Sequence, residues 1–213
     1  NGWTGDAHIP IETGLYNFDG ISIYEKWMND FCDEQKDNGI LPCIIPTSVW
    51  GYDWANGVDW TSAVAIIPWE IAMMKPTAIV LNFARDLLVD EEAMVDALAA
   101  GKIKKYVSYI ESISTNHLTD WGLGDWVPVR SKSNITLTSS IYYYTDVCIL
   151  AKAARLFGYA EDASYYNTLA QKIKEAINTS FLNKETGIYA EGTQTELAMP
   201  LYWGIVPEED NKK

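Results

Sequence analysis

The fold is decided by residues 139–178, which read SSIYYYTDVCILAKAARLFGYAEDASYYNTLAQKIKEAIN. Gly158 divides this stretch into two segments that each repeat apolar residues with a helical period, and glycine commonly ends a helix. The two segments therefore predict an αα-hairpin whose helices pack through one apolar face each. The residues expected on these faces are Ile141, Tyr144, Cys148, Ala151 and Ala154 in the first helix and Ala163, Tyr166, Ala170, Ile173 and Ile177 in the second.

Helical patterns recur on both sides of the hairpin. An N-terminal helix is expected to begin at the capping-box pattern Ser22-x-x-Glu25, to place Ile23, Trp27 and Phe31 on one face, and to end by Gly39. Further helical patterns cover residues 62–74, 77–89, a stretch starting at Asp90, residues 102–114 with Ile103, Val107, Ile110 and Ile113 on one face, and residues 195 to about 204.

Long segments without a regular period separate these helices. They cover residues 40–60, 117–138 and 182–196, and the last includes an expected short strand pair around residues 188–190. Helices that alternate with long loops on one side are typical of an α/α barrel, in which the loops at one rim form the site. We therefore predict an all-α fold of this kind.

Composition limits the classes of protein and partner. The chain has 213 residues, of which 48% are hydrophobic and 21% charged, so it can bury a sizeable core. A net charge of −13 repels phosphate backbones and anionic lipids, and apolar runs such as residues 63–68 are too short to span a bilayer. We expect neither a nucleic acid nor a membrane as a partner.

The cysteines and histidines do not suggest a metal centre. Cys32, Cys43 and Cys148 are an odd number, lie far apart and have apolar neighbours, as small buried side chains do. Only His8 and His117 could assist them. We expect no metal and no cofactor.

A candidate site lies in the first seven residues, Asn1-Gly2-Trp3-Thr4-Gly5-Asp6-Ala7. We expect a loop here, in which Gly2 and Gly5 allow tight turns that present Trp3 and Asp6 to a cleft. An aromatic face can pack on a sugar ring while a carboxylate accepts hydrogen bonds from its hydroxyls. The alternative is a surface turn with a buried tryptophan and a helix-capping aspartate.

Asp-Trp dipeptides occur four times, all within segments predicted to be loops. They admit the same two interpretations, since each tryptophan could meet a sugar or fill the core while the aspartate caps a helix. The dipeptides are Asp53-Trp54, Asp59-Trp60, Asp120-Trp121 and Asp125-Trp126.

Six segments stand in order along nearly the whole chain. They are Gly2-Trp3-Thr4-Gly5-Asp6-Ala7, Glu25-Lys26-Trp27-Met28-Asn29-Asp30, Gly39-Ile-Leu-Pro42, Trp60-x-x-Ala63 with Pro68-Trp69, Gly124-Asp125-Trp126 and Thr193-Gln194-Thr195-Glu196-Leu-Ala198. Together these segments resemble the catalytic domain of bacterial-type α-L-rhamnosidases of glycoside hydrolase family 78.

The resemblance implies a partial (α/α)6 barrel over residues 1–213, truncated at both ends, with long ordered loops on one rim. It also implies inverting hydrolysis of terminal α-L-rhamnosides. Within the rhamnose pocket it places Trp3, Asp6, Trp60, Trp126 and, as a neighbour, Asp125. Asp6 is expected to be an accessory catalytic residue that binds hydroxyls or raises the pKa of the acid.

Two departures from the family pattern bear on this expectation. An acidic residue often stands where this chain has Ser62, and the family's general acid and base fall outside the chain, so this piece alone is expected to be inactive. The remaining barrel helices and accessory β domains are its expected partners, beside the carbohydrate substrate. The alternatives are another inverting α/α-barrel glycosidase, such as an unsaturated uronyl hydrolase, or a non-catalytic carbohydrate-binding piece.

Overall fold

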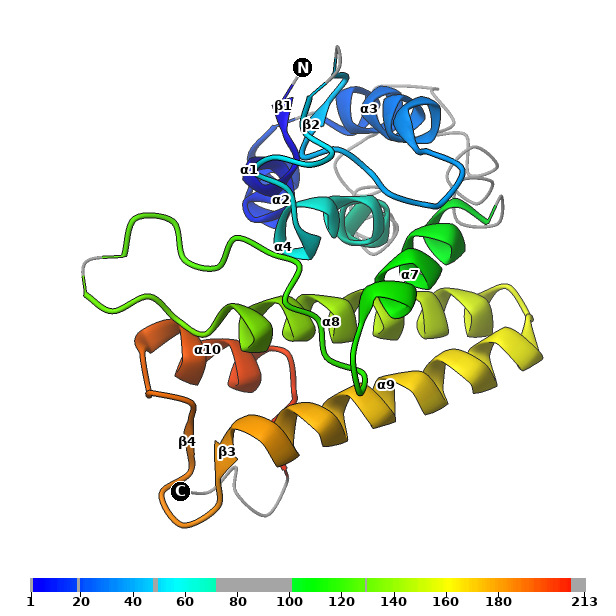
Figure 1. Ribbon diagram of the computed structural model, residues 1–213. Helices are drawn as coiled ribbons and strands as arrows, with labels where there is room; N and C mark the ends of the chain where they lie inside the picture. Colours follow the sequence, from blue (N-terminus) through cyan, green and yellow to red (C-terminus); the bar gives the residue numbers. More distant parts are fainter. Residues whose placement is uncertain (1, 19, 48–49, 72–100, 129, 208–213) are drawn as a thin grey trace.

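A computed structural model describes residues 2–18, 20–47, 50–71, 101–128 and 130–207 of the chain, and most of them are helical (Figure 1). The helices predicted over residues 77–89 and from Asp90 lie outside the described residues. The described elements are β1 (Gly2–Trp3), α1 (Thr4–His8), α2 (Ile11–Asn17), α3 (Ile21–Glu34), β2 (Ile44–Ile45), α4 (Val58–Thr61), α7 (Lys102–Ile113), α8 (Ile135–Leu156), α9 (Ala160–Phe181), β3 (Leu182–Asn183), β4 (Ile188–Tyr189) and α10 (Gln194–Tyr202).

The predicted αα-hairpin is confirmed as α8 and α9, which lie side by side along their length (Figure 1). Gly158 stands in the turn with a φ of +80°, a left-handed conformation that favours glycine. The start of the hairpin was predicted wrongly, because α8 begins at Ile135 and not after residue 138. Asn134 caps it by accepting a hydrogen bond from the Leu137 amide at 3.1 Å.

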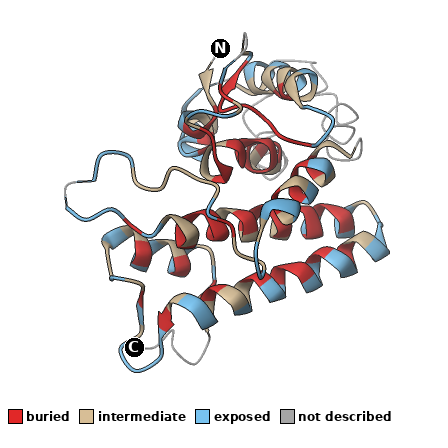
Figure 2. Cartoon of the chain, in the orientation of Figure 1, coloured by how far each residue is buried: buried red, intermediate tan, exposed pale blue. Residues whose placement is uncertain are grey.

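The two helices of the hairpin differ in how far they are buried. In α9 the buried residues form one stripe, and all five residues predicted for it are buried. In α8 buried residues occur on most sides, as Figure 2 shows in red. A helix that is buried nearly all round lies inside a fold, so α8 is an inner helix and α9 an outer one. This is the layering that an α/α barrel requires.

The N-terminal helix α3 corrects part of its prediction. It starts at Ile21 after Gly20, which provides no side-chain cap, so the Ser22-x-x-Glu25 capping box does not start the helix. Phe31 is buried as expected, but Ile23 is 70% exposed. Trp27 fixes the helix to the neighbouring strand, because its Nε1 donates a hydrogen bond to the Ile45 carbonyl at 2.8 Å.

The remaining predicted elements are mostly confirmed. Helix α7 buries Ile103, Val107 and Ile110, whereas Ile113 in its last turn is 38% exposed. The short strand pair is β3–β4, and α10 begins one residue earlier than expected, after a complete capping box between Thr193 and Glu196. Among the helices of the described ranges, none combines the length and the apolar character that crossing a membrane requires.

Candidate functional site

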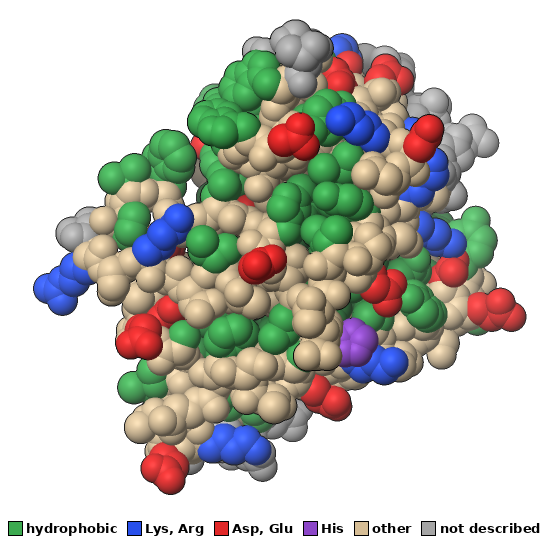
Figure 3. Space-filling view, in the orientation of Figure 1, with side chains coloured by type: hydrophobic (Ala, Val, Ile, Leu, Met, Phe, Trp, Pro, Cys, Tyr) green, Lys and Arg blue, Asp and Glu red, His purple; other side chains and the backbone are tan. Residues whose placement is uncertain are grey.

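Trp3 and three other tryptophans, Trp50, Trp54 and Trp60, form a cluster near the β1–β2 ribbon. The ring centroid of Trp3 lies 5.4 Å from Trp60, 5.8 Å from Trp50 and 6.5 Å from Trp54, and Trp50 and Trp54 are 5.5 Å apart. Trp50 is 45% and Trp54 65% exposed. On the face shown in Figure 3, groups of apolar side chains are visible on the upper part of the molecule. An exposed group of large rings is a common feature of ligand sites.

Backbone hydrogen bonds bring the cluster together from distant parts of the sequence. Strand β1 pairs with β2 in antiparallel register, with Trp3 opposite Ile44. The Thr4 amide then donates to the Cys43 carbonyl at 2.8 Å, and the Cys43 amide donates to the Gly51 carbonyl at 2.8 Å. The loop that carries Trp50 and Trp54 is thereby folded back onto the strand that carries Trp3. Long ordered loops of this kind are usually functional.

The opening segment over residues 2–7 is not the loop that was predicted, since it forms β1 and most of α1. Its two glycines also have different roles. A Cβ on Gly5 would lie 2.3 Å from the Trp60 ring, whereas a Cβ on Gly2 would meet Trp27 at an ordinary 3.5 Å. Gly5 is therefore required so that the Trp60 indole can lie on α1, and Gly2 is not required for packing.

Asp6 lies on the exposed side of α1, while Thr4 and His8 face the core. Burial lowers the pKa of His8, and the Asp59 carbonyl and the nearby negative charge of Asp6 partly oppose this effect. Asp6 is thus an exposed carboxylate on α1, three residues after Trp3 in the chain. Such a pair of aromatic faces and a carboxylate can bind the apolar face and the hydroxyls of a sugar.

Asp59-Trp60 is not in a loop, as was predicted, but in the short helix α4. The backbone amides of Leu123 and Gly124 each donate a hydrogen bond to Asp59 Oδ2 at 2.9 Å. The His8 ring nitrogen Nε2 lies 2.8 Å from the Asp59 carbonyl oxygen. Sequence reasoning missed this aspartate as a residue of interest, and only its place in an Asp-Trp pair could have drawn attention to it.

Asp125 and Trp126 lie on the long segment between α7 and α8, which projects at the left of Figure 1. The Ser133 amide donates to Asp125 Oδ2 at 2.7 Å, and the Thr195 hydroxyl donates to Asp125 Oδ1 at 2.8 Å. Partial burial raises the pKa of Asp125, but these hydrogen bonds and the charge of Lys132 outweigh it and lower the pKa overall. Asp125 therefore braces this segment against α10.

Trp126 is 80% exposed. Among the aromatic ring contacts of the described residues, none joins Trp126 to Trp3 or Trp60. The structure thus brings together Trp3 and Trp60 from the predicted site, adds Trp50 and Trp54, and leaves Trp126 outside the cluster. The spacing of Trp50 and Trp54 in the sequence gave no means of pairing them with Trp3.

Ser62, the position where the family pattern often has an acid, is fully buried. Its Oγ lies 2.7 Å from Asp146 Oδ2 of α8, and burial raises the pKa of Asp146 well above its usual value. Beside it the Thr61 and Tyr106 hydroxyls are 2.7 Å apart. A carboxyl group is thus present next to Ser62, but it comes from another helix and lies inside the core.

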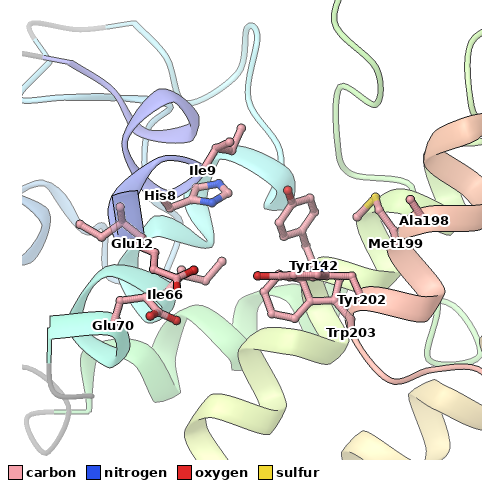
Figure 4. Close-up of a pocket in the computed structure, with 11 residues that line it drawn as sticks. His8, Ile9, Glu12, Ile66, Glu70, Tyr142, Ala198, Met199, Tyr202 and Trp203 are labelled. Atoms are coloured by element: carbon pink, nitrogen blue, oxygen red, sulfur yellow. The ribbon is translucent and has the colours of Figure 1, made fainter. Parts of the chain in front are cut away.

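A cavity of about 370 Å³ lies between α1, α2 and the helix over residues 63–71 on one side and α8 and α10 on the other. Figure 4 shows His8, Glu12 and Glu70 on one wall and Tyr142 and the aromatic end of α10 on the other. Burial raises the pKa of Glu70, the negative charge of Glu12 adds to this effect, and Lys152 opposes it. Glu12 and Glu70 belong to no recognisable sequence motif, so only the fold reveals that they line the same cavity.

No metal centre is indicated in the described parts of the chain, where His, Cys, Asp and Glu nowhere form a group of three placed to hold an ion. The three cysteines are free thiols. Cys43 is buried, and this burial raises its pKa to about 11, so it stays protonated at neutral pH.

Comparisons with known proteins extend over almost the whole chain. The model of the bacterial alpha-L-rhamnosidase 6 hairpin glycosidase domain matches residues 1–83 and 87–213. Curated α-L-rhamnosidases from Alteromonas sp. and Formosa agariphila are 24% and 27% identical over 98% of the chain. This chain spans 22% of the length of each of them, about a fifth.

Solved structures give the same result. An α-L-rhamnosidase from Dictyoglumus thermophilum aligns over 99% of this chain and 22% of its own, with a TM-score of 0.80 and 32% identity. One from Streptomyces avermitilis, solved in complex with L-rhamnose, aligns over 99% of this chain and 19% of its own, with a TM-score of 0.81 and 24% identity. The chain belongs to the family of bacterial α-L-rhamnosidase six-hairpin glycosidase domains.

Proposed function

We propose that the full polypeptide carrying this chain hydrolyses terminal, non-reducing α-L-rhamnose residues from rhamnosides with inversion, and that Trp3, Trp60 and Asp6 bind the rhamnose. The observation that carries the proposal is the Trp3–Trp60 pair at 5.4 Å, together with an exposed carboxylate, Asp6, three residues after Trp3 on α1. The indoles would pack on the apolar face of the sugar, and the carboxylate would accept hydrogen bonds from its hydroxyls. The family assignment supports this substrate class.

Asp6 is proposed as an accessory catalytic residue and not as the general acid. Inversion needs one carboxyl that donates a proton and one that activates water, about 6.5–9.5 Å apart. A negative charge at Asp6 would hold substrate hydroxyls and would favour the protonated form of a neighbouring acid. Asp125 and Trp126 have a secondary place in the proposal, because both oxygens of Asp125 already accept hydrogen bonds and Trp126 lies outside the tryptophan cluster.

The charge at the site favours a neutral sugar over a uronide. If Asp6 binds the sugar as proposed, its carboxylate would repel the carboxylate of an unsaturated uronide, whereas rhamnose carries no charge. The other alternative, a non-catalytic carbohydrate-binding protein, would use the same aromatic faces but would bind the sugar without hydrolysing the rhamnoside.

The experiment is a steady-state assay of the full polypeptide with 4-nitrophenyl α-L-rhamnoside, with NMR of the first sugar anomer released. We expect turnover with inversion and a loss of kcat/KM in Asp6→Asn, with the exposed Asp37→Asn as the matched control. Turnover of an unsaturated uronide in place of the rhamnoside, or binding of rhamnose without turnover, would refute the proposed function.

A further inference from the structure

Three segments carry the proposed sugar site and its surroundings, and they meet at one residue, Asp59. Helix α1 carries Asp6, α4 carries Trp60, and the segment over residues 119–126 carries two Asp-Trp pairs. Asp59 itself belongs to α4. Its carbonyl oxygen is 2.8 Å from His8 Nε2 of α1, and its carboxyl group accepts hydrogen bonds from the Leu123 and Gly124 amides of the 119–126 segment.

The backbone around Asp59 strengthens this connection. The Val58 amide donates to the Trp121 carbonyl at 3.0 Å, so α4 and the 119–126 segment are joined by backbone as well as by side chain. They also touch, since a Cβ on Gly57 would lie 2.3 Å from the Gly122 Cα. The same Cβ would lie 2.7 Å from Asp59 Oδ1, so the carboxylate occupies a space that the two glycines leave open.

The Asp59 carboxyl group is buried at a cost. Asp59 Oδ1 is buried without a hydrogen-bond partner among the described residues, and burial raises the pKa of this carboxyl, although the Leu123 and Gly124 amides lower it. The two amides donate to the other oxygen, Oδ2, so a single side-chain atom joins α4 to the 119–126 segment.

We propose that Asp59 is a positioning residue for the sugar site, which holds the 119–126 segment against α4 so that the Trp60 indole stays on Gly5 and against Trp3. This proposal rests on the proposed function. Asp59 itself touches no substrate. It acts through Trp60, the next residue in the chain, whose ring leaves no room for a Cβ on Gly5.

The test uses the full polypeptide with Asp59→Asn and Asp59→Ala. Asp120→Asn is the matched control, because Asp120 also precedes a tryptophan and lies on the same segment, but it is exposed. The probes are free L-rhamnose by calorimetry, kcat and KM on the 4-nitrophenyl rhamnoside, melting temperature, and hydrogen exchange of the Leu123 and Gly124 amides.

In Asp59→Asn we expect a neutral oxygen that still accepts both amides, a nearly unchanged melting temperature, faster exchange at these two amides, and a rhamnose Kd about tenfold higher. In Asp59→Ala the Kd should rise further, and kcat should fall less than KM rises. Asp120→Asn should match the wild type in every measurement.

Three results would overturn the proposal. The first is an Asp59→Asn protein that binds rhamnose as the wild type does. The second is weaker binding that is accompanied by uniformly faster exchange along the whole chain, which would indicate general destabilisation. The third is unchanged exchange at Leu123 and Gly124, and this readout needs no sugar. A wild type that neither binds L-rhamnose nor hydrolyses the rhamnoside would instead refute the proposed function, and the exchange data would still decide whether Asp59 holds the segment.

Discussion

Helix α9 and the region from β1 to α4 are stabilised in different ways. In α9, burial follows the helical period, and Gly158 in the turn before it has open space around it. Between β1 and α4, glycines such as Gly5 and Gly57 are in contact with a side chain or with backbone, Asp59 Oδ1 is buried, and the Trp54 ring is exposed. The regular packing of α9 serves stability, whereas the second region keeps a shape that packing alone does not favour. This contrast is expected where a protein binds a ligand.

The largest expected effect lies in the hairpin. Tyr166→Ala removes a buried aromatic ring of α9 and should cost roughly 3–5 kcal/mol in the free energy of unfolding. The protein that remains folded should keep the kcat/KM of the wild type, because α9 is an outer helix. Chemical denaturation and kinetics on the folded fraction measure both. A loss of kcat/KM at full folding would mean that the hairpin takes part in the site.

The opposite pattern is expected for Asp6→Asn in the site region. Its side chain is exposed, so the melting temperature should hardly change. The lost charge should reduce kcat/KM by on the order of 2 kcal/mol in transition-state free energy. A much lower melting temperature with a fully active folded fraction would show that Asp6 is a structural residue of α1.

A pair of glycine substitutions compares the two regions directly. Gly5→Ala places a Cβ 2.3 Å from the Trp60 ring and should cost about 1–3 kcal/mol of stability, with weaker rhamnose binding. Gly158→Ala meets no atom within 4 Å and should cost about 1 kcal/mol through its positive φ alone, with unchanged binding. Melting curves and calorimetry test this pair, and equal effects on binding would remove the distinction.

The smallest expected effect concerns Asp125. Asp125→Asn can keep only one of the two accepted hydrogen bonds, so it should lose about 1 kcal/mol at neutral pH. Because the pKa of Asp125 is lowered in the folded state, its stabilisation is present above the usual value of 3.8 and is lost as the pH falls through the folded pKa. Denaturation at several pH values should therefore show the variant and the wild type converging below about pH 4. A constant difference, or loss of sugar binding without loss of stability, would favour a direct role in binding.

The sequence predicted the hairpin well because its evidence is local. Apolar spacing along α9 and the glycine at its start are properties of neighbouring residues, and the structure has the expected stripe. The capping pattern at Ser22 failed because the helix had already begun at Ile21, and Ile23 became exposed although its spacing matched that of Phe31. The spacing of apolar residues predicts that a helix forms, but it does not say which face of that helix the rest of the chain will cover.

The candidate site was only partly predictable. The family resemblance placed Trp3, Asp6 and Trp60 in one pocket, and in the structure the ring centroids of the two tryptophans lie 5.4 Å apart. The addition of Trp50 and the absence of Trp126 depend on how β1 pairs with β2 and on how far the segment before α8 projects. Both features depend on contacts between residues far apart in the sequence, and the spacing of neighbouring residues carries no information about such contacts.

The most direct test of the sugar-site assignment is a crystal structure of the full polypeptide with L-rhamnose. The assignment predicts a sugar ring packed on Trp3 and Trp60 with a hydroxyl on the Asp6 carboxylate. A sugar bound instead in the cavity between Glu12, Glu70 and Tyr142, with the tryptophan cluster empty, would contradict it.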